Sequence, residues 1–399
     1  MFFRKAELNP IDIPKATIDS GNFQTIDQLK KDKCILIIRD EKLWAERKGY
    51  DYHANRKDIL LINKGKSKNK VIKPYNNENS SPKCFYRIIN DERTIIKNIT
   101  IKRTSDSSYK TNVVQLSNLN NILIERLRIE TPANNMYGDK TIGIYNCTNI
   151  QMKNVMINGT YSQENKYGYG IHMDNVYHSI FKSLKATGNW GVFGTNNITE
   201  VTLDNCNINR FDIHCYGKNV YCNNTIFSTL YNQFSSFYGE LTFDKCHFKN
   251  FIPVLLESSY NAYTEFSLRL NDCTWDVDAK HNYLIHAGLL GDTSNKRMEL
   301  SQKYLPSILI KDFKINISSD VNKVFIIHPA SVSGKNEITL PEIRINGLTF
   351  NNSSKEYEDV ELLTSSKYFK VKGNIIYNIK RIKSHPNTSN QFIKIDELK

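Results

Sequence analysis

Residues 201–227 read VTLDNCNINRFDIHCYGKNVYCNNTIF and contain one eight-residue pattern twice, as VTLDNCNI and as VYCNNTIF. In each copy, apolar or small residues alternate with polar ones, the alternation breaks for two residues, and it then resumes. Alternation with a period of two is typical of a short strand with one buried face. The break predicts a tight bend, and both copies place there an Asn, a residue that tolerates a left-handed backbone.

The same pattern recurs along most of the chain. Its ten copies begin at Thr94, Ile122, Ile150, Ser179, Val201, Val220, Leu241, Leu268, Ile308 and Ile343. A third strand is expected before the pattern in many copies, at 141–146, 169–174, 189–194, 210–215, 251–256, 283–288 and 324–329. One such coil cannot bury its apolar face, but a stack of coils can. The repeat therefore predicts an all-β protein, a right-handed parallel β-helix of about ten coils.

The ends of the chain depart from the repeat. We expect three regions: an N-terminal cap (1–90), the β-helix (91–350) and a C-terminal strand or cap region (351–399). A different N-terminal element is expected because the end of a stack must be covered. The cap is predicted to contain a short helix and two strands, and the C-terminal region a final strand, at 22–32, 34–40, 58–65 and 369–379.

The formal net charge is +13, which favours anionic partners such as nucleic acid, an anionic membrane or an acidic polysaccharide. A genome rich in Lys and Asn codons is the alternative explanation. The densest basic run, KGKSKNKVIK (64–73), has no interleaved aromatic residues, so we predict no nucleic-acid partner. No apolar run reaches the ~18 residues of a membrane span, so no membrane insertion is expected.

The N-terminus MFFRKAELNPIDIP lacks the pattern of a Sec signal peptide. A virion or extracellular location would then require another route of release, such as lysis. The eight cysteines form no CxxC motif and have no zinc-type spacing, so we interpret them as small buried side chains without disulfides. No cofactor is predicted; calcium stays an open alternative, although the sequence has no Asp run of the EF-hand type.

Polar side chains of the third strands are expected to share the outer face of the coils. If the apolar residues of YGIHMD and RFDIHC point inward, four polar candidates point outward: His172, Asp174, Asp212 and His214. We expect further residues on or near this face: Tyr145, Phe193, Arg210, Tyr216, Glu257, His286 and His328. The alternative is an ordinary polar surface, since any half-exposed strand carries such residues.

This face predicts chemistry on a glycan. Asp174 and Asp212 would lie two coils apart, about 10 Å, near the ~6.5–9.5 Å carboxyl separation of inverting glycosidases. A His beside them, His172 or His214, would serve as acid or base near neutral pH. Arg210 could hold an acidic sugar, and removal of a proton next to the sugar carboxylate would make the site a lyase. The remaining candidates are assigned to substrate binding: Tyr145, Phe193, Tyr216, Glu257 and His286.

The segment 189–220 resembles the central region of phage-associated β-helix proteins, which have a WG-x-x-G-[ST]-N run, then DxC, then RFDxH. Segments 37–66 and 89–103 resemble their N-terminal part, so the resemblance spans roughly residues 25–230. It implies a pectate-lyase-like tail spike, tail fibre or minor virion protein. Such proteins recognise or cleave host-surface polysaccharide, usually as homotrimers.

Two departures affect the expected site. Ile213 replaces a typically small residue, and Cys215, Tyr216 and Gly217 alter the turn that follows. Because β-helices host lyases, hydrolases and pure binders, two alternatives stay open. One is a non-catalytic receptor-binding or structural virion protein. The other is a bacterial enzyme of surface-glycan metabolism.

Overall fold

The structure of the protein is a computed structural model. It describes residues 2–4, 8–47, 52–76, 81–89, 92–102, 112–130, 141–158, 169–187, 191–228, 231–249, 252–256, 265–277, 282–287, 303–304, 306–318, 321, 324–329, 336–339, 343–352, 360–363, 369–372, 375–378 and 393–395. The chain divides into two compact units, the N-terminal unit (1–202) and the C-terminal unit (203–399), and each is described by itself.

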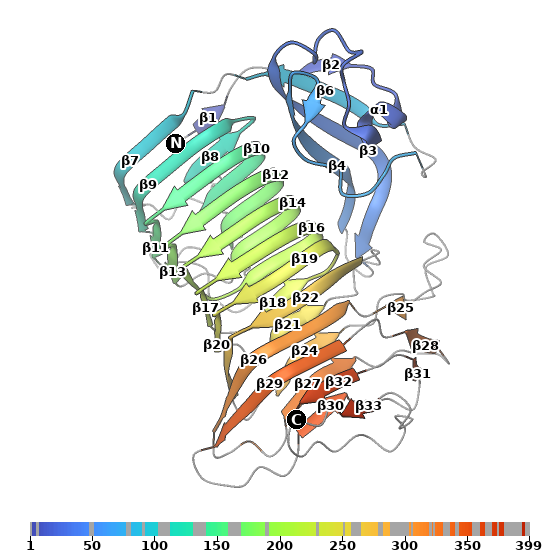
Figure 1. The fold of residues 1–399 in the computed structure, drawn as a ribbon. Coiled ribbons are helices and arrows are strands. Elements are labelled where there is room, and N and C mark those ends of the chain that lie inside the picture. Colours follow the sequence, from blue (N-terminus) through green and yellow to red (C-terminus); the bar gives the residue numbers. More distant parts are fainter. Residues whose placement is uncertain are drawn as a thin grey trace. The chain divides into compact units, whose positions relative to one another are not determined.

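The coils of the N-terminal unit are built from parallel strands (Figure 1). They are β1 (Phe2–Arg4), β7 (Thr94–Lys102), β8 (Val114–Ser117), β9 (Asn120–Glu130), β10 (Ile142–Lys153), β11 (Met156–Asn158), β12 (Tyr169–Lys182), β13 (Lys185–Thr187) and β14 (Gly191–Asp204), which ends past the boundary. Each coil pairs with the next in register, so that Ile122 lies beside Ile150, and Ile150 beside Ser179. These three residues start successive copies of the sequence repeat.

The C-terminal unit continues the same pattern. Its strands are β15 (Asn207–Ile208), β16 (Phe211–Asn223), β17 (Ile226–Ser228), β18 (Tyr231–Phe234), β19 (Phe237–Asp244), β20 (His247–Lys249), β21 (Ile252–Leu256), β22 (Glu265–Asn271), β23 (Thr274–Val277), β24 (Tyr283–Ala287), β26 (Ser307–Ile317), β27 (Val324–Pro329), β29 (Ile343–Asn352), β30 (Val360–Leu363), β32 (Ile375–Asn378) and β33 (Ile393–Ile395). Val220, Leu241, Leu268, Ile308 and Ile343 again pair in order. The expected parallel β-helix is confirmed.

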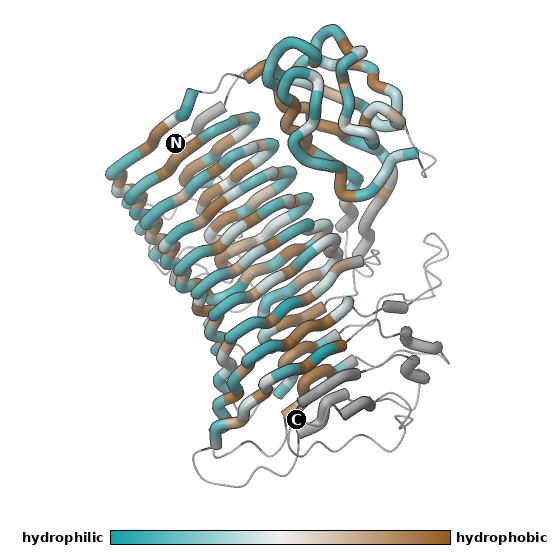
Figure 2. The backbone as a smooth tube through the Cα atoms, viewed as in Figure 1, coloured by the Kyte–Doolittle hydropathy of each residue, from teal (hydrophilic) through white to brown (hydrophobic). Residues whose placement is uncertain are grey.

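The predicted bends are the most regular feature of the coils. In all ten copies, the fifth residue has a positive φ, from 45° at Asn224 to 74° at Gly347. The others are Asn98, Arg126, Asn154, Ser183, Asn205, Lys245, Asp272 and Asp312. The left-handed residue turns the chain between two short strands while the apolar positions on both sides stay inward. Apolar and polar residues therefore alternate along the coils (Figure 2).

A second corner follows the third strand in the N-terminal unit. Asn118, Asn146 and Asn175 occupy it with φ of 56°, 51° and 60°. Asn146 Nδ2 donates to Asn118 Oδ1 at 3.1 Å, and Asn175 Nδ2 donates to Asn146 Oδ1 at 3.0 Å. This ladder fixes the end of each third strand, so that the side chains just before it project from one face.

All eight cysteines are free and buried, as expected. Burial raises the pKa of the Cys147 thiol to about 12. The aromatic core of the C-terminal unit packs by the same register, with the rings of Phe227 and Phe248 stacked at 5.4 Å.

The region expected to form the N-terminal cap, called the cap below, contains an antiparallel sheet of the order β2-β6-β3-β4-β5. The sheet consists of β2 (Asn9–Ile11), β3 (Lys33–Arg47), β4 (Tyr52–Asn63), β5 (Lys66–Ser67) and β6 (Lys83–Ile88). The helix expected at 22–32 is absent; those residues form turns, and α1 (Lys15–Ser20) precedes them. Gly21 ends α1 in the left-handed region, and Phe23 and Leu29 are buried in the core of the cap. Because Phe23 and Leu29 pack into this core, the segment forms turns and not the expected helix.

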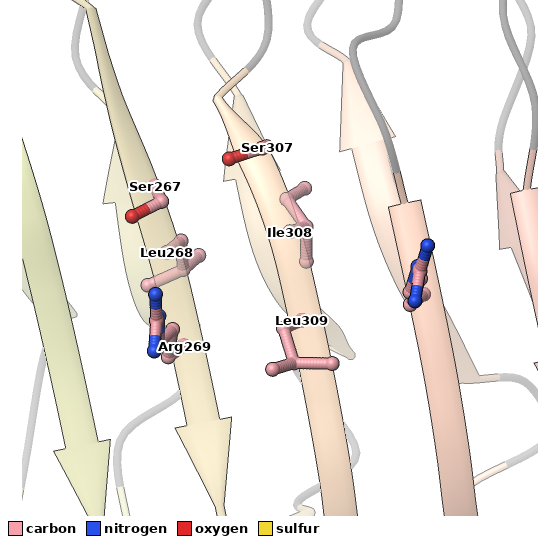
Figure 3. Close-up of a pocket in the computed structure, with 7 residues that line it drawn as sticks. Ser267, Leu268, Arg269, Ser307, Ile308 and Leu309 are labelled. Carbon is pink, nitrogen blue, oxygen red and sulfur yellow. The ribbon is translucent and has the colours of Figure 1, made fainter.

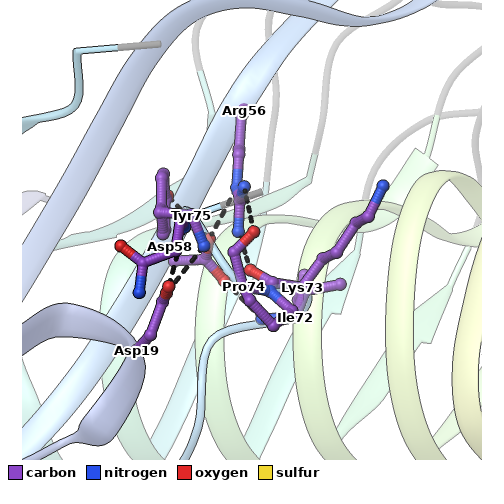
Figure 4. A network of polar contacts seen from close by, with 8 residues as sticks. Asp19, Arg56, Asp58, Ile72, Lys73, Pro74 and Tyr75 are labelled. Atoms are coloured by element: carbon purple, nitrogen blue, oxygen red, sulfur yellow. Dashed lines mark hydrogen bonds and ion pairs between the residues drawn. The ribbon is translucent and has the colours of Figure 1, made fainter. Parts of the chain in front are cut away.

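A buried polar network holds the loop after β5 against the cap sheet (Figure 4). Asp58 accepts bonds from Tyr75 Oη at 2.8 Å, from the backbone N–H of Ile72 at 2.8 Å and from Arg56 Nε at 3.3 Å. The Arg56 guanidinium also donates to the carbonyl of Lys73 and lies 3.4 Å over the Tyr75 ring. Burial raises the pKa of the Asp58 carboxyl, and the Arg56 guanidinium opposes this shift.

The C-terminal strand expected at 369–379 is two strands. β31 (Phe369–Lys372) joins a separate sheet with β25 (Lys303–Tyr304) and β28 (Asn336–Thr339), whereas β32 pairs with β29. Gly373 and Asn374, which separate β31 from β32, lie outside the described residues.

Candidate functional site

The RFDIHC segment forms a compact polar cluster in the C-terminal unit. Arg210 precedes β16, and its Nε donates to Asp212 Oδ1 at 2.5 Å. Its Nη2 donates to Gln233 Oε1 at 3.2 Å, and its guanidinium lies 4.2 Å from the centre of the Tyr231 ring. β16 and β18 pair in parallel, with Asp212 opposite Gln233, so residues of the next coil cover the ion pair of Arg210 and Asp212.

The two predicted catalytic residues of this segment, Asp212 and His214, differ in their exposure to solvent. The side chain of Asp212 is 0% exposed, whereas that of His214 is 17% exposed. The expectation that Asp212 reaches the outer surface is therefore wrong, because Arg210 and its partners from β18 cover the carboxylate. His214 Nε2 lies 4.0 Å from Asp212 Oδ2, which exceeds hydrogen-bond length but keeps the imidazole near a fixed negative charge.

A row of side chains continues from Asp212 across the following coils. Strand pairing places Gln233 beside Leu255, Leu255 beside His286, and His286 beside His328. The Nδ1 atoms of the two histidines are 3.0 Å apart, and their rings stack at 5.0 Å with an angle of 14°. Burial, and then the neighbouring His286, lower the pKa of His328 to about 4.

Aromatic rings lie two or three residues before this row on the same strands. Tyr231 pairs with Ile252, and Tyr283 with Phe325. The Tyr283 ring lies 5.1 Å from Phe325 and 4.2 Å from His328. All four rings are partly exposed, so they present faces on which a sugar ring can stack.

Tyr231, Gln233 and Tyr283 are not among the residues predicted for the site. β18 reads YNQF, which lacks the apolar alternation used to find the other third strands. The spacing of the repeat is the signal that locates it, because a third strand is due between the copies that begin at Val220 and Leu241.

A second cluster occupies the third strands of the N-terminal unit. Register places His172 beside Gly143 and Asp174 beside Tyr145, whose ring is 5.7 Å from that of His172. Lys57, from β4 of the cap, donates its Nζ to Asp174 Oδ2 at 2.9 Å. His172 is buried, and the Asp174 side chain is 23% exposed. The cap thus provides a cation for a carboxylate that the sequence analysis had placed on an open face.

Gly143 makes room for this cluster. A Cβ at position 143 would lie 2.3 Å from Asn112 Nδ2 and 2.7 Å from the Tyr145 ring. The glycine therefore allows the Asn112 amide and the Tyr145 phenol to lie over the strand, where Asn112 Nδ2 and Tyr145 Oη are 3.4 Å apart. Burial raises the pKa of Tyr145.

Two predicted substrate-binding aromatics are instead buried. Phe193 is fully buried and packs edge-on against Phe181 at 4.9 Å, so its expected outer position is wrong. The outer position next to it belongs to Gly194, where a Cβ would lie 2.6 Å from the Tyr169 ring.

Tyr216 is also buried; it has a φ of 59° and stacks on Tyr238 at 5.9 Å. Glu257 lies outside the described residues. Asp174 belongs to the N-terminal unit and Asp212 to the C-terminal unit. Their separation of about 10 Å stays a prediction.

Within the described ranges, no three His, Cys, Asp or Glu side chains gather closely enough to hold a metal ion. Over the same ranges, no helix is long and apolar enough to cross a membrane.

A phage tailspike protein of known structure shares this fold. The tailspike gp49 from Pseudomonas phage LKA1 superposes with a TM-score of 0.58 at 10% identity, over 97% of this chain and 66% of that chain. The chain thus spans just under two thirds of that tailspike. The Gp54 tailspike of Acinetobacter baumannii bacteriophage AP22, solved with a capsular saccharide, gives 0.48 at 10% identity over 86% of this chain and 62% of that one. The tailspike gp61 of Pseudomonas phage phi297 gives 0.47 at 10% identity over 85% and 61%.

No family model matches the sequence. No curated protein matches it either.

Proposed function

We propose that the protein binds and cleaves an acidic polysaccharide of a host cell surface, as a tailspike-type depolymerase. The observation that carries this proposal is the row on the third strands of the C-terminal unit, where His214 lies beside a buried Arg210–Asp212 pair. Tyr283 and His286 on β24, and His328 on β27, lie on the third strands of later coils. An enzyme of this kind needs aromatic rings on which sugars stack and, beside them, a group that transfers protons. The net charge of +13 favours an acidic polymer.

His214 is the residue we assign to proton transfer. It is the partly exposed member of its cluster, so a polymer on this face can reach its imidazole. Asp212, which is fully covered, acts as a positioning residue that keeps a negative charge 4.0 Å from His214. Arg210 orients the Asp212 carboxylate through the bond from Nε to Oδ1. His214 can remove the proton next to a sugar carboxylate, as in a lyase, or protonate a leaving oxygen, as in a hydrolase.

A purely binding protein is the second candidate. It is favoured by the burial of Asp212, because a carboxylate held by Arg210 and shielded from solvent cannot contact the polymer. The aromatic and imidazole rings would then serve as a receptor-binding surface alone. An enzyme of bacterial surface-glycan metabolism would use the same residues.

One assay separates enzyme from binder. The protein is incubated with capsule, teichoic acid and lipopolysaccharide, and chain length is followed by gel filtration. We expect shortening of one acidic polymer by the native protein and a loss of at least a hundredfold in rate for His214→Asn. Ultraviolet absorbance of the products identifies a lyase, which leaves an unsaturated end, and its absence during cleavage identifies a hydrolase.

His247→Asn is the matched control, because His247 lies on β20 and bonds to Asp276 at 2.7 Å, away from the third strands. Equal rates for His214→Asn and the native protein would refute the assignment of His214. Binding without shortening of any polymer would leave only the receptor-binding candidate.

We also propose a homotrimer on a virion. This proposal is supported by the fold shared with tailspikes. Sedimentation equilibrium of the isolated protein tests it, and a monomer at micromolar concentration would contradict it.

A further inference from the structure

A separate cavity of about 410 Å³ opens on the strands that start the repeat in the C-terminal unit. Figure 3 shows Ser267, Leu268 and Arg269 on β22 beside Ser307, Ile308 and Leu309 on the neighbouring strand β26. Arg344 of β29 completes the lining. None of these residues belongs to the third strands that carry His214.

Strand register sets two arginines in one row. Arg269 pairs with Leu309, and Leu309 pairs with Arg344, so the arginines lie two strand spacings apart. That distance is about 10 Å between backbones. Ser267 pairs with Ser307 two residues earlier, on the same face because side chains alternate with a period of two. The outward face of the lining therefore combines two cations, the apolar side chain of Leu309 and two hydroxyls, whereas Leu268 and Ile308 are buried.

The same row continues toward the start of the unit. Tyr221 pairs with Thr242, and Thr242 pairs with Arg269. Tyr221 is 40% exposed, which is unusual for an aromatic residue in this structure. Five strands in one row span about 19 Å, the length of a short run of sugar residues.

Glu240 holds the guanidinium of Arg269 in place. Arg269 is 45% exposed and donates its Nη2 to Glu240 Oε1 at 2.9 Å. A guanidinium presents a planar fork of donors that fits a carboxylate in a bidentate manner. Glu240 both orients this fork and competes with any acidic ligand for it.

We propose that this cavity binds the carboxylate of an acidic sugar residue and acts as an accessory subsite for a uronate-containing polysaccharide. Arg269 and Arg344 pair with carboxylates, Ser267 and Ser307 bond to sugar hydroxyls, and Leu309 packs against the apolar face of a ring. The inference deepens the proposed function, because it names the substrate class. Its test measures binding at the cavity and not cleavage.

The probes are oligosaccharides of polygalacturonate, alginate and hyaluronate, together with their carboxyl-reduced forms, measured by calorimetry with the full chain. We expect the native protein to bind at least one uronate oligosaccharide. Arg269→Gln and Arg344→Gln should each weaken the affinity for this oligosaccharide about tenfold, because each variant loses one charge-assisted contact. Glu240→Gln should strengthen binding, because it frees the Arg269 fork from a competing carboxylate. Carboxyl-reduced probes should not distinguish these variants.

Lys314→Gln controls for net charge, because Lys314 is an exposed cation on the same strand β26, past the bend at Asp312. Thermal melting of each variant checks that it is folded. The inference is overturned if Arg269→Gln and Lys314→Gln have equal effects or if no uronate probe binds. Loss of cleavage in His214→Asn with unchanged uronate affinity would show that the two sites are separate.

Discussion

Arg210 and Asp212 form an ion pair inside the C-terminal unit, with Nε and Oδ1 2.5 Å apart and side chains 3% and 0% exposed. Such a pair is costly to disrupt, because removal of one partner leaves the other charged in a low-dielectric environment. Asp212 therefore contributes to the fold whether or not it contributes to catalysis. A variant that removes the carboxylate cannot by itself identify a catalytic acid.

We predict that Asp212→Ala destabilises the protein by about 3–5 kcal/mol, because it leaves the Arg210 guanidinium buried without its counter-charge. Asp212→Asn should cost less, since the amide oxygen still accepts a bond from Arg210. Thermal melting and urea unfolding measure the difference. Asp244→Ala is the control, as that carboxylate is partly exposed and bonds to the Tyr221 hydroxyl. Equal losses for Asp212→Ala and Asp244→Ala would contradict the buried pair.

The lowered pKa of His328 predicts that the stability of the protein depends on pH. Its pKa is lowered from 6.5 to about 4 in the folded protein, so between these values the unfolded chain binds more protons. Stability is therefore fully present above pH 6.5 and falls as the pH decreases toward 4. Because partial exposure screens the charge, we expect the loss to be on the order of 1–2 kcal/mol.

Melting temperatures at pH 7.5 and pH 4.5 should differ more for the native protein than for His328→Gln, which cannot titrate. His178→Gln is the matched control in the N-terminal unit, where the ring bonds to Asn149 Oδ1. The prediction fails if His328→Gln shows the native pH dependence.

The coils could be predicted because their determinants are local. A residue that tolerates positive φ, such as Asn205 or Asn224, and alternation on either side of it are both visible in eight residues of sequence. The register of the coils then followed from the spacing of the copies. The residues at 22–32 could not be predicted in this way, because their turns depend on Phe23 and Leu29 packing into the cap core.

The site was less accessible to sequence analysis, because exposure depends on the neighbouring coil. Asp212 occupies an outward position by alternation, but Gln233 and Tyr231 from the next coil lie over its partner Arg210. Asp174 likewise meets Lys57, which is 117 residues away along the chain. Neither contact has a local signal in the sequence.

Lys245 tests the energetic role of the bends. It holds the left-handed position of its coil with a φ of 51°, where most repeats have Asn, Asp or Gly. An L-residue without a short polar side chain pays about 1–2 kcal/mol in this region. We expect Lys245→Asn to stabilise the protein by about 0.5–1 kcal/mol and Lys245→Val to destabilise it by at least 1 kcal/mol.

Thermal midpoints of the two Lys245 variants provide the measurement. The corresponding substitution at an exposed strand position, Lys249→Asn, should be neutral, which removes any general effect of lost charge. A gain of stability in Lys245→Val would show that the backbone at this bend does not require a left-handed residue.

Arg56 and Lys57 are neighbours on β4, and their ion pairs should contribute differently to the free energy of unfolding. Arg56 is 0% exposed and bonded to Asp58, whereas Lys57 is 36% exposed and bonded to Asp174. Because the first pair is buried, Arg56→Met should cost about 3–5 kcal/mol by leaving the Asp58 carboxylate without its cation. The second pair is solvated, so Lys57→Met should cost about 1 kcal/mol or less.

Urea unfolding of both variants, followed by the fluorescence of the native tryptophans, compares the two costs directly. High salt should narrow the difference between native protein and Lys57→Met, since solvated pairs are screened, and should leave the effect of Arg56→Met nearly unchanged. If Lys57→Met proved as destabilising as Arg56→Met, the Lys57–Asp174 contact would be a principal attachment of the cap to the coils. In that case, Asp174 would belong to the structure of the cap and not to a glycan site.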